Sequence, residues 1–253
     1  MTPTQWHLAR TFATWLCLAL GEVLSCKGVS PRPPSWVHPT SSEWRRAAES
    51  LDRLRSEARS PYVASVRTSL HEPKTGRTVD GRGAVAVIPR QAMRMILVGP
   101  AGATLLDAWV TPTRWRVAVP PLELVRVGGV QEPDDLPIGF WRWWFLTPLE
   151  GTLFAAAMMG DRSLLLLREG DATVELVVGT CGAGQRVAAA RRVRGRTERV
   201  DACRAGALPG AGDSVHYVDE ASGLEVDVVV ESASERSASA AALRDPDAHE
   251  GQP

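Results

Sequence analysis

The chain contains 253 residues, 44% of them hydrophobic and 23% charged, which is enough apolar material for one buried core. Its 29 lysines and arginines balance 29 aspartates and glutamates, so the formal charge at pH 7 is +0. Because loss of residues 1–25 would remove one charge of each sign, Arg10 and Glu22, the balance persists in a shortened chain and disfavours nucleic acid as a partner.

The first 25 residues have the pattern of a signal peptide for export. Arg10 precedes an apolar run over residues 12–20 (FATWLCLAL), which has the length of a signal-peptide core. That run is too short to cross a bilayer, which takes about 20 apolar residues. We therefore expect residues 1–25 to direct the chain across a membrane and then to be removed.

Residues 23–26 (VLSC) resemble the lipobox of bacterial lipoproteins, in which an apolar residue, a spacer and a small residue precede the acylated cysteine. The resemblance implies that Cys26 carries lipid such as palmitate and ties the protein to a membrane. More than one acyl chain is needed for stable anchoring. The alternative is an ordinary secretory signal cleaved nearby, with Cys26 incidental.

Two further cysteines, Cys181 and Cys203, remain after Cys17 leaves with the signal and Cys26 takes lipid. Disulfides persist in oxidising compartments, so these two are expected to form a bridge. The alternative is a reactive Cys181 within a glycine-rich stretch, but no histidine lies nearby in the sequence to activate a thiolate.

Residues 26–40 are rich in proline and predict an extended tether. Residues 40–43 (TSSE) then form a capping-box pattern, and apolar residues follow at helical spacing, which predicts a helix over about 41–59. We expect this helix to pack on its own domain; a partner-binding or membrane-surface role is the alternative.

From Pro61 onward, short apolar stretches alternate with turn residues, which predicts strands. Because such short connections join antiparallel strands, we expect a sheet that must curl, close or split. The first group of strands is expected at about 62–71, 79–89, 92–98, 103–110, 114–119 and 123–127. The second group is expected at about 151–159, 162–169, 172–179, 185–193, 196–202, 213–218 and 223–231.

Between the two groups, residues 132–146 hold five aromatic residues within six positions and predict a short helix that could cap the open face of a curled sheet. Residues 232–253 consist largely of serine, alanine and charged residues and predict a disordered tail. The domain is therefore expected to span 41–231.

Several stretches resemble the lipoprotein-localisation family of periplasmic carriers and outer-membrane receptors (LolA/LolB-like). Residues 81–106 resemble the family's early hairpins, 134–146 its helix after the mid-chain loop, and 200–228 its last strands. The resemblance implies a mainly β fold, an open half-barrel of about 11 antiparallel strands with a few helices covering the concave face. The space between would accept acyl chains.

Residues 153–159 and 164–167 are apolar on both faces of their strands, whereas a strand with one wet face should alternate. Either protein covers both faces or one face lines a cavity. The resemblance also suggests that Arg94 lies at the cavity rim, although a solvent-facing position is the alternative. The expected cavity-lining residues are Met95, Leu97, Leu106, Trp109, Trp141, Trp144, Phe154, Met158 and Leu165.

The sequence contains no recognisable catalytic arrangement: the five histidines are scattered without metal-ligand spacing, and no hydrolase or nucleotide-binding motif is present. We therefore expect no enzyme, no cofactor and no metal site. Six arginines between 186 and 199 either contact anionic lipid headgroups or an acidic partner, or form a solvated strand edge.

Two hypotheses follow. The first is a lipid-anchored carrier on the periplasmic side of the outer membrane, with acyl chains or other lipoproteins as ligands. The second is a structural or adaptor lipoprotein of an envelope complex, with a filled interior.

Overall fold

The computed structural model describes residues 36–39, 41–57, 60–73, 75–133, 136–147, 149–182, 184–205, 209–235, 239 and 241–247. All of these residues belong to one compact unit, Ser35–Pro253. The expected signal peptide, Cys26 and most of the tether lie outside the described residues.

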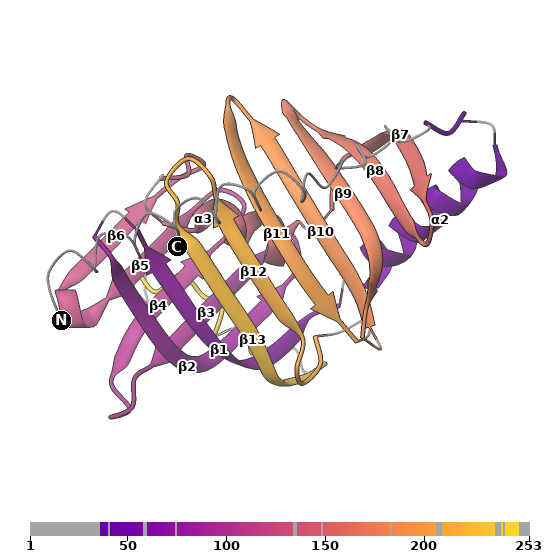
Figure 1. The fold of residues 1–253 in the computed structure, drawn as a ribbon. Helices are drawn as coiled ribbons and strands as arrows, with labels where there is room; N and C mark the ends of the chain where they lie inside the picture. Colours follow the sequence, from indigo (N-terminus) through magenta and orange to yellow (C-terminus); the bar gives the residue numbers. More distant parts are fainter. Residues whose placement is uncertain are drawn as a thin grey trace, which may run out of the picture. The chain divides into compact units, whose positions relative to one another are not determined.

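Thirteen antiparallel strands form a single open sheet in the order β6-β5-β4-β3-β2-β1-β13-β12-β11-β10-β9-β8-β7 (Figure 1). The resemblance implied about 11 strands, and this number was wrong. The thirteen stretches marked off by turn residues agree with the strands that form. The strands are β1 (Tyr62–Glu72), β2 (Arg77–Ile88), β3 (Ala92–Val98), β4 (Thr104–Val110), β5 (Trp115–Val119), β6 (Leu124–Gly128), β7 (Thr152–Met159), β8 (Arg162–Glu169), β9 (Ala172–Cys181), β10 (Gly184–Val193), β11 (Arg196–Arg204), β12 (Ser214–Asp219) and β13 (Glu225–Ser234).

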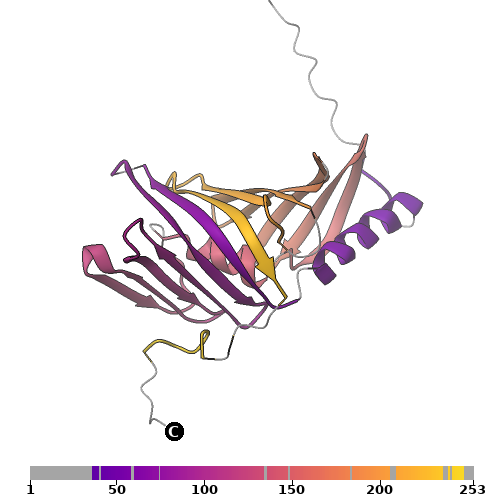
Figure 2. The ribbon, with the colours of Figure 1, turned by 90° about the horizontal axis from the view of Figure 1, so that it is seen from below.

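The pairing of β1 with β13 joins two meanders into one sheet. Strands β1–β6 and β7–β13 each run in sequence order, and the long-range ladder from Val63↔Ser234 to His71↔Glu225 connects them. Since β6 and β7 are the two edges of this order, the sheet stays open between them. It is curved, with the short aromatic helix on its hollow side (Figure 2).

Helix α2 (Ser42–Glu57) begins where Ser41 Oγ accepts a hydrogen bond from the Trp44 amide at 3.1 Å. Such a side-chain cap satisfies an amide that the helix leaves without a partner. Thr40, the expected first residue of the capping box, lies outside the described residues. Ala47, Leu51 and Leu54 are buried in the core of the domain, which confirms that the helix packs on its own domain.

The aromatic segment forms α3 (Ile138–Phe140) and continues as a wider turn, η2 (Trp141–Leu146), in which the Thr147 amide bonds to the Arg142 carbonyl. The segment is almost wholly buried against one face of the sheet. This confirms the expectation of a short helix that caps the sheet. A further short helix, η1 (Pro120–Leu122), connects β5 to β6.

The expected disulfide is present: Cys181 and Cys203 are joined, with their Cα atoms 6.0 Å apart. It ties the end of β9 to β11 across the start of β10, where Gly184 pairs with Cys181. A Cβ on Gly184 would lie 2.3 Å from the Arg204 carbonyl oxygen, so this crossing needs glycine.

The C-terminal part departs from the disordered tail predicted from composition. Strand β13 continues to Ser234. Residues 241–247 pack on the outer face of β3–β5, where Leu243 is buried and its carbonyl accepts a hydrogen bond from Trp109 Nε1 at 2.9 Å. Arg114 and Asp245 form an ion pair in the same region. In this segment of serine, alanine and charged residues, Leu243 is a large apolar residue whose side chain the fold buries.

Replacing both Cys181 and Cys203 with serine should lower the free energy of unfolding. The bridge spans a sequence separation of 22, and closing a loop of that length stabilises a protein by about 3 kcal/mol in the chain-entropy model. Urea unfolding followed by circular dichroism measures the change, with Cys26→Ala as the control for loss of an unrelated cysteine. Equal midpoints for the double variant and the control would contradict the prediction.

Candidate functional site

An apolar cavity of about 70 Å³ lies between the helices and the middle of the sheet. Leu54 of α2 and Trp144 and Phe145 of η2 form one wall. The other wall comes from strands on both sides of the β1–β13 junction. Its apolar lining residues are Tyr62, Ala64, Val66, Val85, Val187, Val215, Val228 and Val230.

The polar groups at the cavity margin are mostly engaged with the protein itself. The Asp213 carboxylate accepts hydrogen bonds from the amides of Ala205 and Gly210, both at 2.8 Å. Burial raises the pKa of Tyr62, and the nearby Arg204 opposes this shift. The cavity therefore presents a mainly hydrophobic surface with its polar atoms at the edge, as small-molecule sites commonly do.

The two walls are held in different ways. The sheet wall is a continuous hydrogen-bond ladder. On the helix side, Arg55 donates hydrogen bonds to the carbonyls of Leu149 and Gly151, linking α2 to the segment after η2. The Arg90 amide bonds to the Leu146 carbonyl at 2.8 Å. The helix side is therefore held by apolar packing and separate hydrogen bonds rather than by a continuous ladder.

Size limits what the cavity holds in this conformation. A water molecule takes about 30 Å³ of liquid, and a cavity of about 150 Å³ accommodates benzene. At about 70 Å³, the space admits a few carbon atoms but not an acyl chain. A longer ligand would need the cavity to widen or would extend beyond it.

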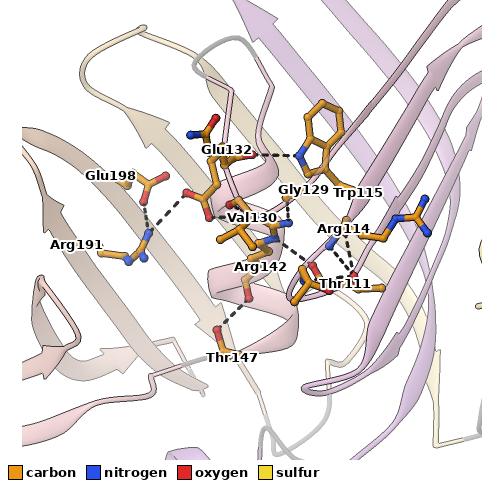
Figure 3. Close-up of polar contacts among 12 residues, drawn as sticks. Thr111, Arg114, Trp115, Gly129, Val130, Glu132, Arg142, Thr147, Arg191 and Glu198 are labelled. Carbon is orange, nitrogen blue, oxygen red and sulfur yellow. Dashed lines mark hydrogen bonds and ion pairs between the residues drawn. The ribbon is translucent and has the colours of Figure 1, made fainter.

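A second cavity of about 190 Å³ lies on the other side of η2, and the charged residues Glu132, Arg142 and Arg191 are part of its lining. Figure 3 shows the polar contacts of these three residues. Arg142 of η2 lies at its wall and donates hydrogen bonds to the carbonyls of Thr111 at 3.0 Å, Val130 at 2.7 Å and Gly129 at 2.7 Å. One side chain thus ties the aromatic segment to two loops of the first meander. Burial lowers the pKa of Arg142, and Glu132 partly offsets this effect.

Arg191 occupies the centre of a group of three carboxylates beside this cavity. Its Nη1 lies 3.0 Å from Glu198 and 4.0 Å from Glu132, and its Nε lies 3.3 Å from Glu169. Glu198 is fully buried and also accepts a hydrogen bond from the Tyr217 hydroxyl at 2.9 Å. A charge this deeply buried is tolerated only with such partners.

Gly139 explains how two of these carboxylates approach the aromatic segment. A Cβ at this position would lie 2.6 Å from Glu198 Oε1 and 2.8 Å from Glu132 Oε2. The pKa of Glu132 is raised by burial first and by the Glu198 charge second. Burial likewise raises the pKa of Glu169.

The residues expected at the cavity differ in where they lie: one lines the cavity, six face the core and three lie on the outer face of the sheet. Trp144 lines the apolar cavity. Met158 is half-buried near the end of β7, on the side of the core residue Ala156. Five more residues are buried in the main core and support the cavity without lining it: Met95, Leu97, Leu106, Trp141 and Leu165.

Trp109, Phe154 and Arg94 lie on the outer face, and the expectation that they belong to the cavity was wrong. Ala108 and Val110 face the core, so the intervening Trp109 points outward to Leu243. Arg94 donates two hydrogen bonds, both 2.9 Å, to Asp107. A register shift between Leu153 and Ala155 turns Phe154 outward, where it is exposed beneath Arg168.

Sequence reasoning missed the residues at the β1–β13 junction, such as Val66, Val228 and Val230. The sequence predicts the strands that carry these residues. The side chains lie close together only because β1 pairs with β13, and these two strands are more than 150 residues apart. The arginines between 186 and 199 are largely paired with acids, as in Arg186–Asp201, Arg192–Glu175 and Arg199–Glu220. These pairs favour a solvated surface over a free cationic patch.

Within the described residues, no cluster of histidine, cysteine or acidic side chains has metal-binding geometry. The same part of the chain contains no helix long and apolar enough to cross a bilayer.

No family model and no curated protein matches the chain. Among solved structures, a LolA superfamily protein from Nitrosomonas europaea aligns with a TM-score of 0.50 at 13% identity and covers 75% of this chain and 93% of its own length. At this identity the likeness shows a shared fold.

Two further solved structures align more loosely. An uncharacterized conserved protein from Thermus thermophilus has a TM-score of 0.38 at 13% identity, covering 80% of this chain and 96% of that chain. A putative outer membrane lipoprotein-sorting protein domain from Vibrio parahaemolyticus has a TM-score of 0.38 at 8% identity, covering 75% and 90%. The alignment with the LolA superfamily protein confirms the LolA-like resemblance found in the sequence at the level of the fold.

Replacing Glu132 with glutamine should stabilise the protein at neutral pH. A carboxyl whose pKa is higher when folded than its ordinary 4.5 binds a proton more tightly in the folded state. Stability then falls as pH rises from 4.5 through the folded pKa. Glutamine mimics the protonated form, so its advantage should be present at pH 7.5 and shrink toward pH 4.5.

Urea unfolding at several pH values measures this difference, with the exposed Glu225→Gln as the matched control. If E132Q is less stable than the parent at every pH, then burial does not raise the pKa of Glu132 in the folded protein.

Proposed function

We propose that this protein is a lipoprotein of the bacterial envelope, anchored through Cys26, whose apolar cavity takes lipid acyl chains in the handling or transport of lipoproteins at the outer membrane. The cavity between η2 and the β1–β13 junction is the observation that carries this proposal. It combines apolar walls with one wall that is held by side-chain packing and separate hydrogen bonds instead of a sheet ladder.

Three independent observations support the proposal. The fold is shared with a LolA superfamily protein. The Cys181–Cys203 disulfide is typical of an oxidising compartment such as the periplasm. The signal-like residues 12–20 and the lipobox-like residues 23–26 fit export followed by acylation. The proposed location is therefore the periplasmic side of the outer membrane.

The proposed role is binding rather than catalysis. Besides the Tyr62 hydroxyl, the polar side chains that line the apolar cavity are Ser60, Arg204, Asp213 and Ser214, and this set includes no histidine to serve as a base for a serine nucleophile. The Asp213 carboxylate is already occupied by two backbone amides.

A second function is favoured by the small size of the cavity. Core side chains fill most of the space between the helices and the sheet, leaving about 70 Å³. A structural or adaptor lipoprotein of an envelope complex needs no larger space. The two functions differ in whether the helix wall opens for a ligand.

A lipid-binding measurement separates the two functions. The protein with Cys26→Ala should acquire a fluorescent fatty acid, and Val228→Phe should weaken this binding, because phenylalanine would occupy the space that the chain must enter. The matched control is Val229→Phe on the same strand, since Val229 is exposed on the opposite face. Native mass spectrometry without detergent provides a second readout of co-purified lipid.

Equal affinity in V228F and V229F would count against this cavity as the binding site. An empty protein that also rejects the probe would support the adaptor function.

The anchor is tested separately by metabolic labelling. Labelled palmitate should enter the full-length protein in a bacterium that acylates lipoproteins, and Cys26→Ala should abolish the label, because the lipobox-like segment provides a single acceptor thiol. The readout is radioactivity or a clickable tag in the purified band. Replacement of the earlier Cys17 by alanine is the control, and equal labelling of C26A and the parent would disprove acylation at Cys26.

A further inference from the structure

The outer face at the β7 end of the sheet is apolar. Antiparallel register places Trp36, Ala157, Leu164 and Val177 in one row across β7, β8 and β9. Paired residues of an antiparallel sheet share a face. We define the outer apolar patch as Trp36, Phe154, Met159, Leu164, Leu166 and Val177.

The patch is confined to this end of the sheet. Farther along the same face, charged pairs replace the apolar row, as in Arg186–Asp201 between β10 and β11 and His216–Asp227 between β12 and β13. Charged pairs begin on β9 itself, where Glu175 lies beside Leu166 and pairs with Arg192, so the apolar character is a local feature of β7, β8 and Val177.

The patch also explains why 164–167 is a run of four leucines. Leu165 and Leu167 are fully buried in the core, so Leu164 and Leu166 face the other way. A sheet with one wet face normally alternates apolar and polar residues. Trp36 remains 54% exposed, Phe154 45% and Met159 39%, so the described residues leave this face incompletely covered.

We propose that the outer apolar patch rests on the surface of a lipid bilayer, beside the anchor at Cys26. This inference depends on the proposed anchor. Trp36 is ten residues from Cys26 (36 − 26), and ten residues span at most about 35 Å. A bilayer that holds Cys26 therefore lies within reach of the patch, whatever path the intervening residues take.

The side chains around the patch fit the bilayer interface. Tryptophan is enriched at the level of lipid headgroups because its ring is apolar and its N–H is polar. Arg162 and Arg168 are exposed next to the apolar residues, and Arg168 lies 5.6 Å from the centre of the Phe154 ring. Guanidinium groups at such positions can pair with lipid phosphates.

A second group of exposed apolar residues, Leu122, Leu124, Val125, Val127 and Val130, lies at the β6 edge. This edge is at the opposite end of the strand order from β7. The chain reaches the sheet from Cys26 through Trp36, which pairs with Ala157 of β7. Because the chain that follows Cys26 joins the sheet at β7, the proposal assigns membrane contact to the β7 end.

The test uses the full-length lipoprotein reconstituted in vesicles of phosphatidylcholine and phosphatidylglycerol. An environment-sensitive NBD fluorophore is attached through Met159→Cys in the patch or through His216→Cys, the exposed control on the same face. The expected result is a blue-shifted emission from position 159, strong quenching by doxyl-labelled lipid and several-fold less quenching by iodide. Position 216 should behave as in water.

The remaining outcomes separate the patch from the anchor. Vesicle-bound protein with both positions open to iodide would overturn the patch while the anchor stands. Protein that fails to float with the vesicles would overturn the anchor and the patch together. Shielding of position 159 without vesicles, together with a dimeric mass, would show that a second copy covers this face and would overturn the membrane contact.

Discussion

Coverage of one face of an open sheet is the constraint on which the rest of this structure depends. Thirteen strands present a nearly continuous apolar face, and the β1–β13 ladder makes that face a single surface. Because the sheet does not close on itself, its own curvature cannot bury the face. The aromatic segment of α3 and η2 provides the cover, and Phe140 stacks on Tyr217 with the rings 4.6 Å apart.

The cover is held in place by buried charges on one side and by apolar contacts on the other. Arg142 binds three carbonyls, and Glu198 approaches the backbone at Gly139. Breaking such a network exposes unpaired charges and is costly. Trp144 and Phe145, by contrast, face a cavity across which only van der Waals contact and apolar burial act. The segment is therefore held by hydrogen bonds and ion pairs on the side of Arg142, and by apolar packing on the side that faces the cavity.

Turn chemistry made the strands predictable, but it did not reveal which way each side chain points. Glycine-containing turns separate the apolar stretches, and thirteen strands formed where these stretches lie. Facing depends on register, in which a shift by one residue exchanges the faces. The irregularity between Leu153 and Ala155 turned Phe154 outward, and Trp109 lies between two core residues, Ala108 and Val110. Leu243, in a segment of low hydrophobicity, gave no periodic signal to predict its burial.

The polarity of the two sheet faces connects the cavity with the membrane contact. At the β1–β13 junction the inner face lines the cavity, while the outer face carries charged residues such as Arg67 and Glu231. At β7 and β8, and at Val177 of β9, both faces carry apolar residues, so this end is suited to apolar surroundings on its outer side. Helix α2 packs near β7 and contributes Leu54 to the cavity wall. If the proposed membrane contact and the proposed acyl-chain binding both hold, the bilayer would lie at the end of the sheet where α2 packs, so the source of the ligand would be close to the helix side of the cavity.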